Sequence, residues 1–185
     1  PRALEFFDRV ALERAGRDPD FPFEPAWGAL LLVEFDGEPG QPELALQRFA
    51  ESLGDRGPLE VRVANEEGRR RALWQLRRST SRLVKAGATG WITEDVAVPL
   101  GHLPALVARL PEIGEQFGLI ALGYGHAGDG NLHVNLLWED PSGAEHAEAA
   151  ADAVIDAALA LGGTISAEHG IGLAKRRFLP REVGE

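Results

Sequence analysis

Hydrophobic positions recur along the chain with two periods, about 3.6 residues in some segments and two residues in others, and these periods predict alternating helices and strands. Helical spacing and end signals predict helices over 2–16, 42–53, 66–86 and 104–117, and a last helix from Ser142, its predicted cap, to Gly162-Gly163. Short apolar runs ended by turn residues predict strands over 29–35 (expected to be buried), 59–63, 91–98, 119–124 and 131–138.

The last two predicted strands, 119–124 and 131–138, are separated only by a short glycine-rich turn, so they must pair antiparallel. We therefore predict an α+β fold, an antiparallel sheet with helices packed on one face, built from ferredoxin-like β-α-β units. Since the chain contains no internal repeat and no linker-like tract, we expect residues 1–185 to form one domain.

The strand 131–138 has one apolar and one polar face. Side chains alternate along a strand, so Asn131, His133 and Asn135 point to the same side. The opposite side is apolar and consists of Leu132, Val134, Leu136 and Trp138. The apolar side is the expected core face, and the polar row therefore faces a site or solvent.

Composition narrows the function classes. With 44% apolar residues the chain can bury a core, and no apolar run approaches the length of a membrane span. The absence of cysteine excludes disulfides, thiolate catalysis and iron–sulfur ligation, and a net charge of −10 argues against nucleic acid as a partner. We expect a cytoplasmic protein that is either free or peripherally attached to the inner face of a membrane. The chain starts with proline and has no methionine, which predicts a piece of a longer product.

Basic residues concentrate between Arg69 and Lys85, a stretch with seven Lys or Arg residues and no acidic residue. One interpretation is a solvated helix face that is balanced by acidic neighbours. The other is that one or two of the arginines face an anionic ligand.

The glycine-rich segment 125–135 contains two imidazoles, His126 before the predicted turn and His133 after it. A hairpin brings these two side chains together, whereas a separation of seven residues does not suit one face of a helix. Glycines at positions 125, 128 and 130 allow a tight turn and the close approach of a ligand.

A second cluster, 166–172, supplies a carboxylate, Glu168, and a third imidazole, His169. His126, His133 and Glu168 together form a two-histidine, one-carboxylate set, which leaves coordination positions open for substrate. Zn²⁺ or Mn²⁺ suits these nitrogen and oxygen ligands, and His169 is then free to act as a base. The alternative is that both clusters are turns with purely structural hydrogen bonds.

Four stretches carry a family resemblance: LLVEFDG (31–37), LWQLRRS (73–79), GYGHAGDGNLHVNL (123–136) and SAEHGIGLAKRRFLP (166–180). In these stretches the chain resembles the C-terminal substrate, or cap, domain of FAD-linked oxidases of the vanillyl-alcohol-oxidase type. It is most similar to the branch with D-lactate dehydrogenase, D-2-hydroxyglutarate dehydrogenase and the glycolate oxidase flavin subunit.

The resemblance implies a flavoenzyme that oxidises a small 2-hydroxy acid to a 2-oxo acid by hydride transfer to FAD. The FAD is expected to be held mainly by an upstream FAD-binding domain, which this chain lacks, as it lacks the family's C-terminal tail. The resemblance further implies that the three ligand candidates above hold the divalent metal, that His169 is the general base and that Arg77 binds the substrate carboxylate. Asn135 is expected close to flavin or substrate. The hydroxy acid, the metal and the electron acceptor stay open.

Two other functions remain as alternatives. One is a flavin-independent metal hydrolase that uses the same two histidines and Glu168. The other is a non-catalytic module that docks a partner subunit.

Overall fold

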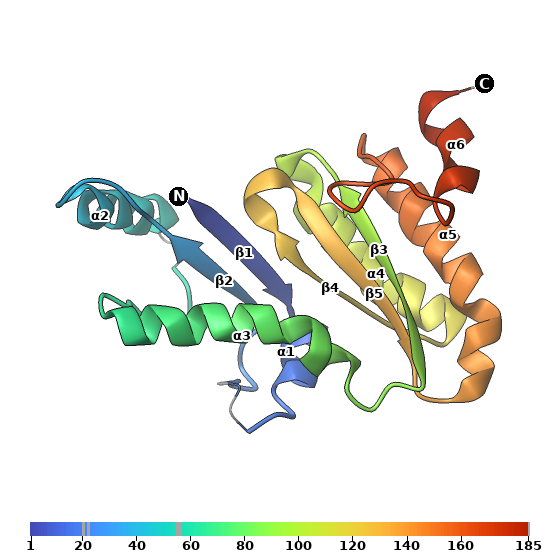
Figure 1. Ribbon diagram of the computed structural model, residues 1–185, viewed down its shortest axis with the longest axis horizontal. Coiled ribbons are helices and arrows are strands. Elements are labelled where there is room, and N and C mark those ends of the chain that lie inside the picture. Colours follow the sequence, from blue (N-terminus) through green and yellow to red (C-terminus); the bar gives the residue numbers. More distant parts are fainter. Residues whose placement is uncertain (20, 22, 55–56, 185) are drawn as a thin grey trace.

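The computed structural model describes residues 1–19, 21, 23–54 and 57–184, and within them five strands form one antiparallel sheet in the order β2-β1-β4-β5-β3 (Figure 1). The strands are β1 (Ala3–Asp8), β2 (Ala29–Glu34), β3 (Gly90–Ala97), β4 (Ile120–His126) and β5 (Asn131–Trp138). The α-helices are α1 (Arg9–Ala15), α2 (Gln41–Leu53), α3 (Glu67–Lys85), α4 (Leu103–Phe117), α5 (Ala144–Ala160) and α6 (Leu179–Val183). The predicted α+β class and the antiparallel sheet are confirmed.

A split β-α-β unit forms the centre of the fold. β3 and β4 each pair antiparallel with β5, so they run parallel to each other with β5 between them and α4 as their connection. After α5 the chain returns to β3 through a bridge between Thr164 and Ala97. This is the arrangement of a ferredoxin-like unit, as predicted.

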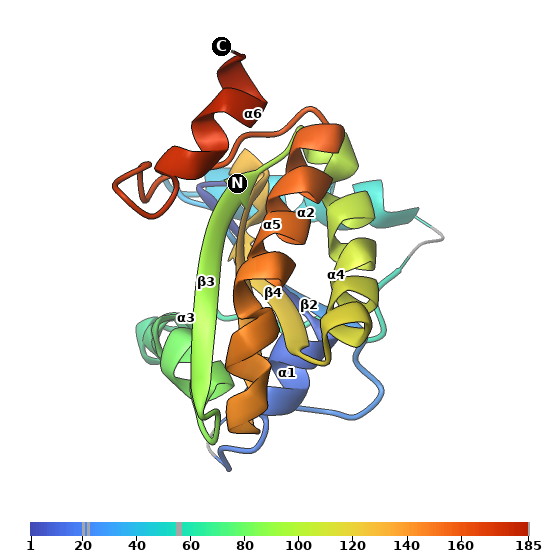
Figure 2. The ribbon, with the colours of Figure 1, turned by 90° about the vertical axis from the view of Figure 1, so that its right-hand side faces the viewer.

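Helices cover both faces of the sheet, although unequally. α4 and α5 pack on each other and on the face formed by β3, β4 and β5. The prediction of helices on one face describes this layer, but α1 and α3 also pack together on part of the opposite face (Figure 2). The remaining part of that opposite face holds the polar side chains described below.

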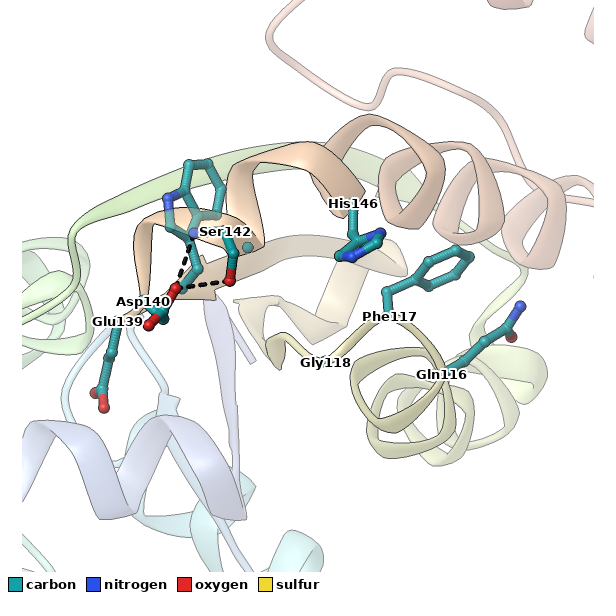
Figure 3. Close-up of a pocket in the computed structure, with 9 residues that line it drawn as sticks. Gln116, Phe117, Gly118, Glu139, Asp140, Ser142 and His146 are labelled. Atoms are coloured by element: carbon teal, nitrogen blue, oxygen red, sulfur yellow. Dashed lines mark hydrogen bonds between the residues drawn. The ribbon is translucent and has the colours of Figure 1, made fainter.

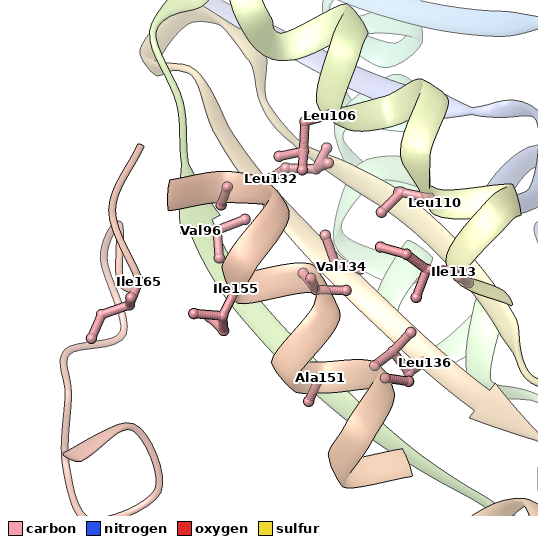
Figure 4. Close-up of a cluster of buried hydrophobic side chains, with 14 of the residues drawn as sticks. Val96, Leu106, Leu110, Ile113, Leu132, Val134, Leu136, Ala151, Ile155 and Ile165 are labelled. Atoms are coloured by element: carbon pink, nitrogen blue, oxygen red, sulfur yellow. The ribbon is translucent and has the colours of Figure 1, made fainter. Parts of the chain in front are cut away.

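The main core lies between the sheet and the helix pair α4 and α5 (Figure 4). Leu132, Val134 and Leu136 of β5 are completely buried there and Trp138 packs against them, so the predicted core face of this strand is confirmed. A second core lies under α1 and α3 and includes Phe7 and Leu122.

The prediction of a helix over 2–16 is wrong in its first half. Ala3–Asp8 is a strand that pairs with β2 on one side and β4 on the other, and only Arg9–Ala15 is helical. Pairing with two neighbouring strands outweighs helical spacing in this stretch. Asp8 then begins the helix, because its carboxylate accepts a hydrogen bond from the backbone N–H of Ala11.

Two strand predictions also need correction. Residues 59–63 form no strand, and the Leu59 side chain is 79% exposed, because this β-prone segment finds no pairing partner among the described residues. The strand at 29–35 exists as β2, but it lies at the sheet edge and Leu31 is 53% exposed, so it is not buried.

The start of α5 differs from its predicted cap. Ser142 lies in a short 3₁₀ turn, Pro141–Gly143, that precedes the helix, and the side chain that caps this turn is Asp140. The helix itself begins at Ala144 without a side-chain cap. Among the described helices none is long and apolar enough to cross a membrane.

Candidate active site

The site lies on the polar face of β5, and sheet register decides which side chains meet there. His133 stands directly opposite Tyr124 of β4 on one side and Asp95 of β3 on the other. Directly opposed residues of antiparallel strands place their Cβ atoms about 5 Å apart, so the three side chains form a row across the sheet.

The β4–β5 hairpin brings His126 beside this row, and the two imidazole rings meet edge to face with centroids 5.4 Å apart. The turn depends on Gly130, which adopts a left-handed backbone with φ +71°. A Cβ at this position would lie 2.0 Å from the carbonyl oxygen of Val98, so only glycine fits. The glycine therefore serves the hairpin's own backbone packing, whereas the sequence alone is compatible with a tight turn and with the close approach of a ligand.

The second cluster reaches the site on the loop after α5, which passes the ends of β3 and β5 (Figure 1). Asp95 holds this loop. Its Oδ2 accepts hydrogen bonds from the backbone N–H groups of Ala167, Glu168 and His169 at 3.1, 2.8 and 2.8 Å, respectively. The buried Lys175 fastens the far side of the loop by donating to the carbonyl oxygens of Asp95 and Ile165.

The three imidazoles of the site converge on one carboxylate oxygen. Glu168 Oε1 lies 3.5 Å from His126 Nε2, 3.3 Å from His133 Nε2 and 3.7 Å from His169 Nε2. The His169 ring is stacked on the His133 ring with centroids 5.2 Å apart. The structure therefore brings together His126, His133, Glu168 and His169, which the sequence analysis singled out.

These distances fit a metal ion. Ligands bonded at about 2.1 Å in a tetrahedral site are separated by about 3.4 Å. Asp95, His133, Glu168 and His169 each offer a ligand atom within 4.8 Å of the others. His126 lies outside this group of four but within reach of Glu168, so five side chains share the donor positions.

Burial sets the protonation of the central groups. It lowers the pKa of the His133 imidazole below its ordinary value, although Asp95 and Glu168 oppose this shift. Burial by itself raises the pKa of the Asp95 carboxyl. Hydrogen bonds from the backbone N–H groups of His169 and Glu168 are the largest of several effects that lower it, and together these effects hold the pKa below its ordinary value. Near neutral pH the site therefore contains a neutral imidazole beside an ionised carboxylate, the forms that bind metals.

Arg77 extends from α3 over the same face of the sheet, and its side chain is 13% exposed. Its guanidinium lies over the ring of Tyr124, 5.5 Å from the centroid, and its Nε donates to Glu5 Oε2 at 2.5 Å. The other carboxylate oxygen of Glu5 lies 2.7 Å from His126 Nδ1. Within the basic stretch 69–85, Arg77 thus points inward. Arg69 and Arg71 instead make exposed ion pairs with acidic residues at the start of α3.

Asn135 is fully buried and already has partners. Its Oδ1 accepts from Thr93 Oγ1 at 2.9 Å, and its Nδ2 donates to the carbonyl oxygen of His133 at 3.2 Å. In this arrangement it supports the row of site residues, and its contact with flavin or substrate stays a prediction.

Sequence reasoning missed Glu5 and Asp95. A helix over 2–16 gives Glu5 no neighbouring strand, so its position opposite His126 does not follow from the sequence pattern. Asp95 had a usable signal, since two acidic residues in the middle of a predicted strand, Glu94 and Asp95, are unusual and one of them must point to each face.

Two other hollows lack this chemistry. One is polar and lies at the opposite end of β5, where Asp140 accepts from the backbone N–H and the hydroxyl of Ser142 and where His146 lies next to Phe117 (Figure 3). The other is lined mostly by apolar side chains of β1, β2 and α4. Neither contains a residue of the histidine cluster.

Comparison with known proteins agrees with the motifs. The glycolate oxidase subunit GlcD of Escherichia coli K12 is 29% identical over 180 residues, which cover 95% of this chain and 36% of the relative. The D-2-hydroxyglutarate dehydrogenase of Stutzerimonas stutzeri is 31% identical over 188 residues, 96% of this chain and 40% of the relative. The mitochondrial D-lactate dehydrogenase [cytochrome] of Arabidopsis thaliana is 30% identical over 159 residues, 83% of this chain and 28% of the relative.

The chain thus spans well under half the length of these relatives. The family described as "FAD linked oxidases, C-terminal domain" matches it over residues 1–185. This chain therefore belongs to the FAD-linked oxidase C-terminal domain family.

Proposed function

We propose that residues 1–185 form the substrate domain of a FAD-dependent dehydrogenase or oxidase that converts a 2-hydroxy acid into a 2-oxo acid. The observation that carries this proposal is the convergence of three imidazoles on Glu168, linked through Glu5 to the inward-pointing Arg77. A chain of this family with such a cluster has groups for binding a carboxylate and for removing a proton.

In this proposal His126, His133 and Glu168 hold a divalent metal, Zn²⁺ or Mn²⁺. The nitrogen and oxygen donors and their spacing support this assignment, because His126 and His133 both turn Nε2 toward the same oxygen of Glu168. A bound divalent ion supplies Lewis acidity toward the hydroxyl of the substrate.

His169 is the proposed general base. Its side chain is more exposed than that of His133, and it adjoins Glu168 in the chain, so it faces the open side of the cluster. Asp95 fixes its backbone and the His133 ring lies against its own, which orients the imidazole for taking the hydroxyl proton.

Arg77 is the proposed carboxylate-binding residue. Its Nε is engaged by Glu5, so the two terminal nitrogens of the guanidinium stay available for a bidentate contact with a carboxylate. FAD, when bound, supplies the two-electron redox chemistry that no side chain of this domain provides. An FAD-binding domain upstream of this chain is the proposed partner.

A dye-linked assay of the full-length protein tests the proposal. Purified protein with bound FAD is mixed with an artificial electron acceptor and, in turn, D-lactate, glycolate and D-2-hydroxyglutarate. We expect dye reduction with at least one acid and loss of that activity in Arg77→Ala. Absence of turnover with all three acids, together with metal-dependent ester hydrolysis, would instead favour the flavin-independent hydrolase.

A further inference from the structure

Glu5 is a buried carboxylate that contacts two groups of the site at once. Its side chain is 5% exposed, one oxygen lies 2.7 Å from His126 Nδ1 and the other accepts from Arg77 Nε. Glu5 lies on β1, outside the four stretches in which the sequence resembles the family.

Sheet register explains the first contact. Glu5 of β1 stands directly opposite His126 of β4, so both side chains leave the same face of the sheet. A carboxylate only accepts hydrogen bonds, and therefore the His126 Nδ1 beside it must carry the proton. In the neutral ring the lone pair is then on Nε2, the nitrogen that lies 3.5 Å from Glu168.

The second contact determines which edge of the Arg77 guanidinium is free. Glu5 binds at Nε, while the guanidinium carbon lies over the Tyr124 ring. The two terminal nitrogens of the Arg77 guanidinium therefore form the edge that can donate hydrogen bonds to a carboxylate ligand. One residue thus sets both the tautomer of a proposed metal ligand and the direction of the proposed substrate-binding cation.

Stability alone is a poor explanation for such a buried carboxylate. Moving charges out of water is costly, and the gain from pairing them often does no more than offset that cost. What the arrangement does provide is fixed geometry between two side chains that come from a strand and a helix far apart in the sequence.

We infer that Glu5 is a positioning residue that couples the metal site to carboxylate recognition by holding the His126 imidazole and the Arg77 guanidinium on a single carboxylate. The inference rests on the proposed function, because it assigns Glu5 a role in that same site. Glu5 touches neither substrate nor metal in this scheme, and it acts only through its two partners.

Substitution of Glu5 in the full-length, FAD-loaded protein tests the inference. Glu5→Gln retains the shape but removes the negative charge that both contacts share. Its single amide oxygen can accept from only one of the two partners, so one contact is lost and the other is weakened. Zn²⁺ titration of metal-stripped protein is expected to show a 10- to 100-fold weaker affinity, the usual effect of removing the partner of a metal-bound histidine. At saturating Zn²⁺, KM for the hydroxy acid is expected to rise about tenfold or more with a smaller change in kcat, since Arg77 contributes binding.

Glu5→Asp is the second variant. It keeps the buried negative charge, which protects the fold, but it is one methylene too short to reach both partners, so the same two losses are expected. Glu34→Gln is the matched control, because Glu34 lies on the neighbouring strand and contacts α3 through Trp74, away from the cluster. FAD content and Tm confirm that each variant is folded.

The outcomes separate the two ideas. Unchanged Zn²⁺ affinity and unchanged KM in folded Glu5→Gln or Glu5→Asp protein would overturn the inference and leave the proposed function standing. A wild-type protein that binds no divalent metal and oxidises no 2-hydroxy acid would overturn the proposed function, and the inference with it.

Discussion

Asp8 is the residue whose effect on stability is most directly calculable from the structure. It begins α1 by accepting from Ala11 N–H at 2.7 Å, and its second oxygen accepts from Gly123 N–H of β4 at 2.6 Å. Burial outweighs both hydrogen bonds and raises the pKa of the Asp8 carboxyl from 3.8 to about 6. Asp8 therefore joins α1 to β4, and its titration makes the stability of the fold depend on pH.

The direction of the pH effect follows from the raised pKa. Between pH 3.8 and about 6 the folded chain holds a proton on Asp8 that the unfolded chain has released. The contribution of Asp8 to the free energy of unfolding is thus fully present below pH 3.8 and is lost as the pH rises toward 6. Above that pH the free energy of unfolding no longer changes with the titration of Asp8. A rise of about two pKa units at 1.36 kcal/mol per unit corresponds to a loss of about 3 kcal/mol.

The perturbation is Asp8→Asn, which removes the titration and keeps the size of the side chain. Urea unfolding of both proteins at pH 4, 5, 6 and 7 gives the free energy difference between wild type and variant at each pH. We expect wild type to gain about 2 kcal/mol or slightly more relative to Asp8→Asn as the pH falls from 7 to 4, which is most of the full effect. A difference that is independent of pH, or that changes in the opposite direction, would refute the reasoning.

Three further predictions concern the core and the site. Leu132→Ala removes a fully buried side chain and should lower the free energy of unfolding by about 2–5 kcal/mol. Leu31→Ala, on the edge strand, should change that free energy by about 0.5 kcal/mol or less. Equal effects of the two substitutions in urea unfolding would contradict the assigned core. Asp95→Ala leaves the backbone N–H groups of Ala167, Glu168 and His169 without their acceptor, which loosens the loop after α5. Trypsin should then cleave after the exposed Arg176 about tenfold faster or more. An unchanged cleavage rate would show that Asp95 does not hold the loop. His133→Ala should abolish binding of one equivalent of Zn²⁺ in isothermal titration calorimetry, and retained stoichiometric binding would remove this residue from the metal site.

The fold was predictable where local pattern and tertiary pairing agree. Alternation in 131–138 separated the core face of β5 from its polar face correctly, because one side of that strand packs under α4 and α5. The pattern failed at 2–16 and at 59–63, since the presence of a strand depends on available partners. The N-terminal strand finds two partners, and the segment 59–63 finds none among the described residues.

The candidate site was predictable only in part, for the same reason. His126, His133, Glu168 and His169 lie in two motifs, and a hairpin plus a returning loop suffices to bring them together. Asp95 is far from both motifs in the sequence and reaches them only through sheet register. The orientation of a side chain by a cross-strand neighbour cannot be inferred before the strand order is known.

The most direct test of the central claim is anaerobic reduction of the flavin in the full-length protein. On mixing with a 2-hydroxy acid that supports turnover, the oxidised flavin absorbance of wild type is expected to bleach in a single turnover. His169→Asn should keep its FAD but bleach at least about 100-fold more slowly, since a positioned general base contributes about 10²–10⁴ in rate. A wild-type flavin that stays oxidised with every 2-hydroxy acid, or a His169→Asn protein that bleaches as fast as wild type, would contradict the account.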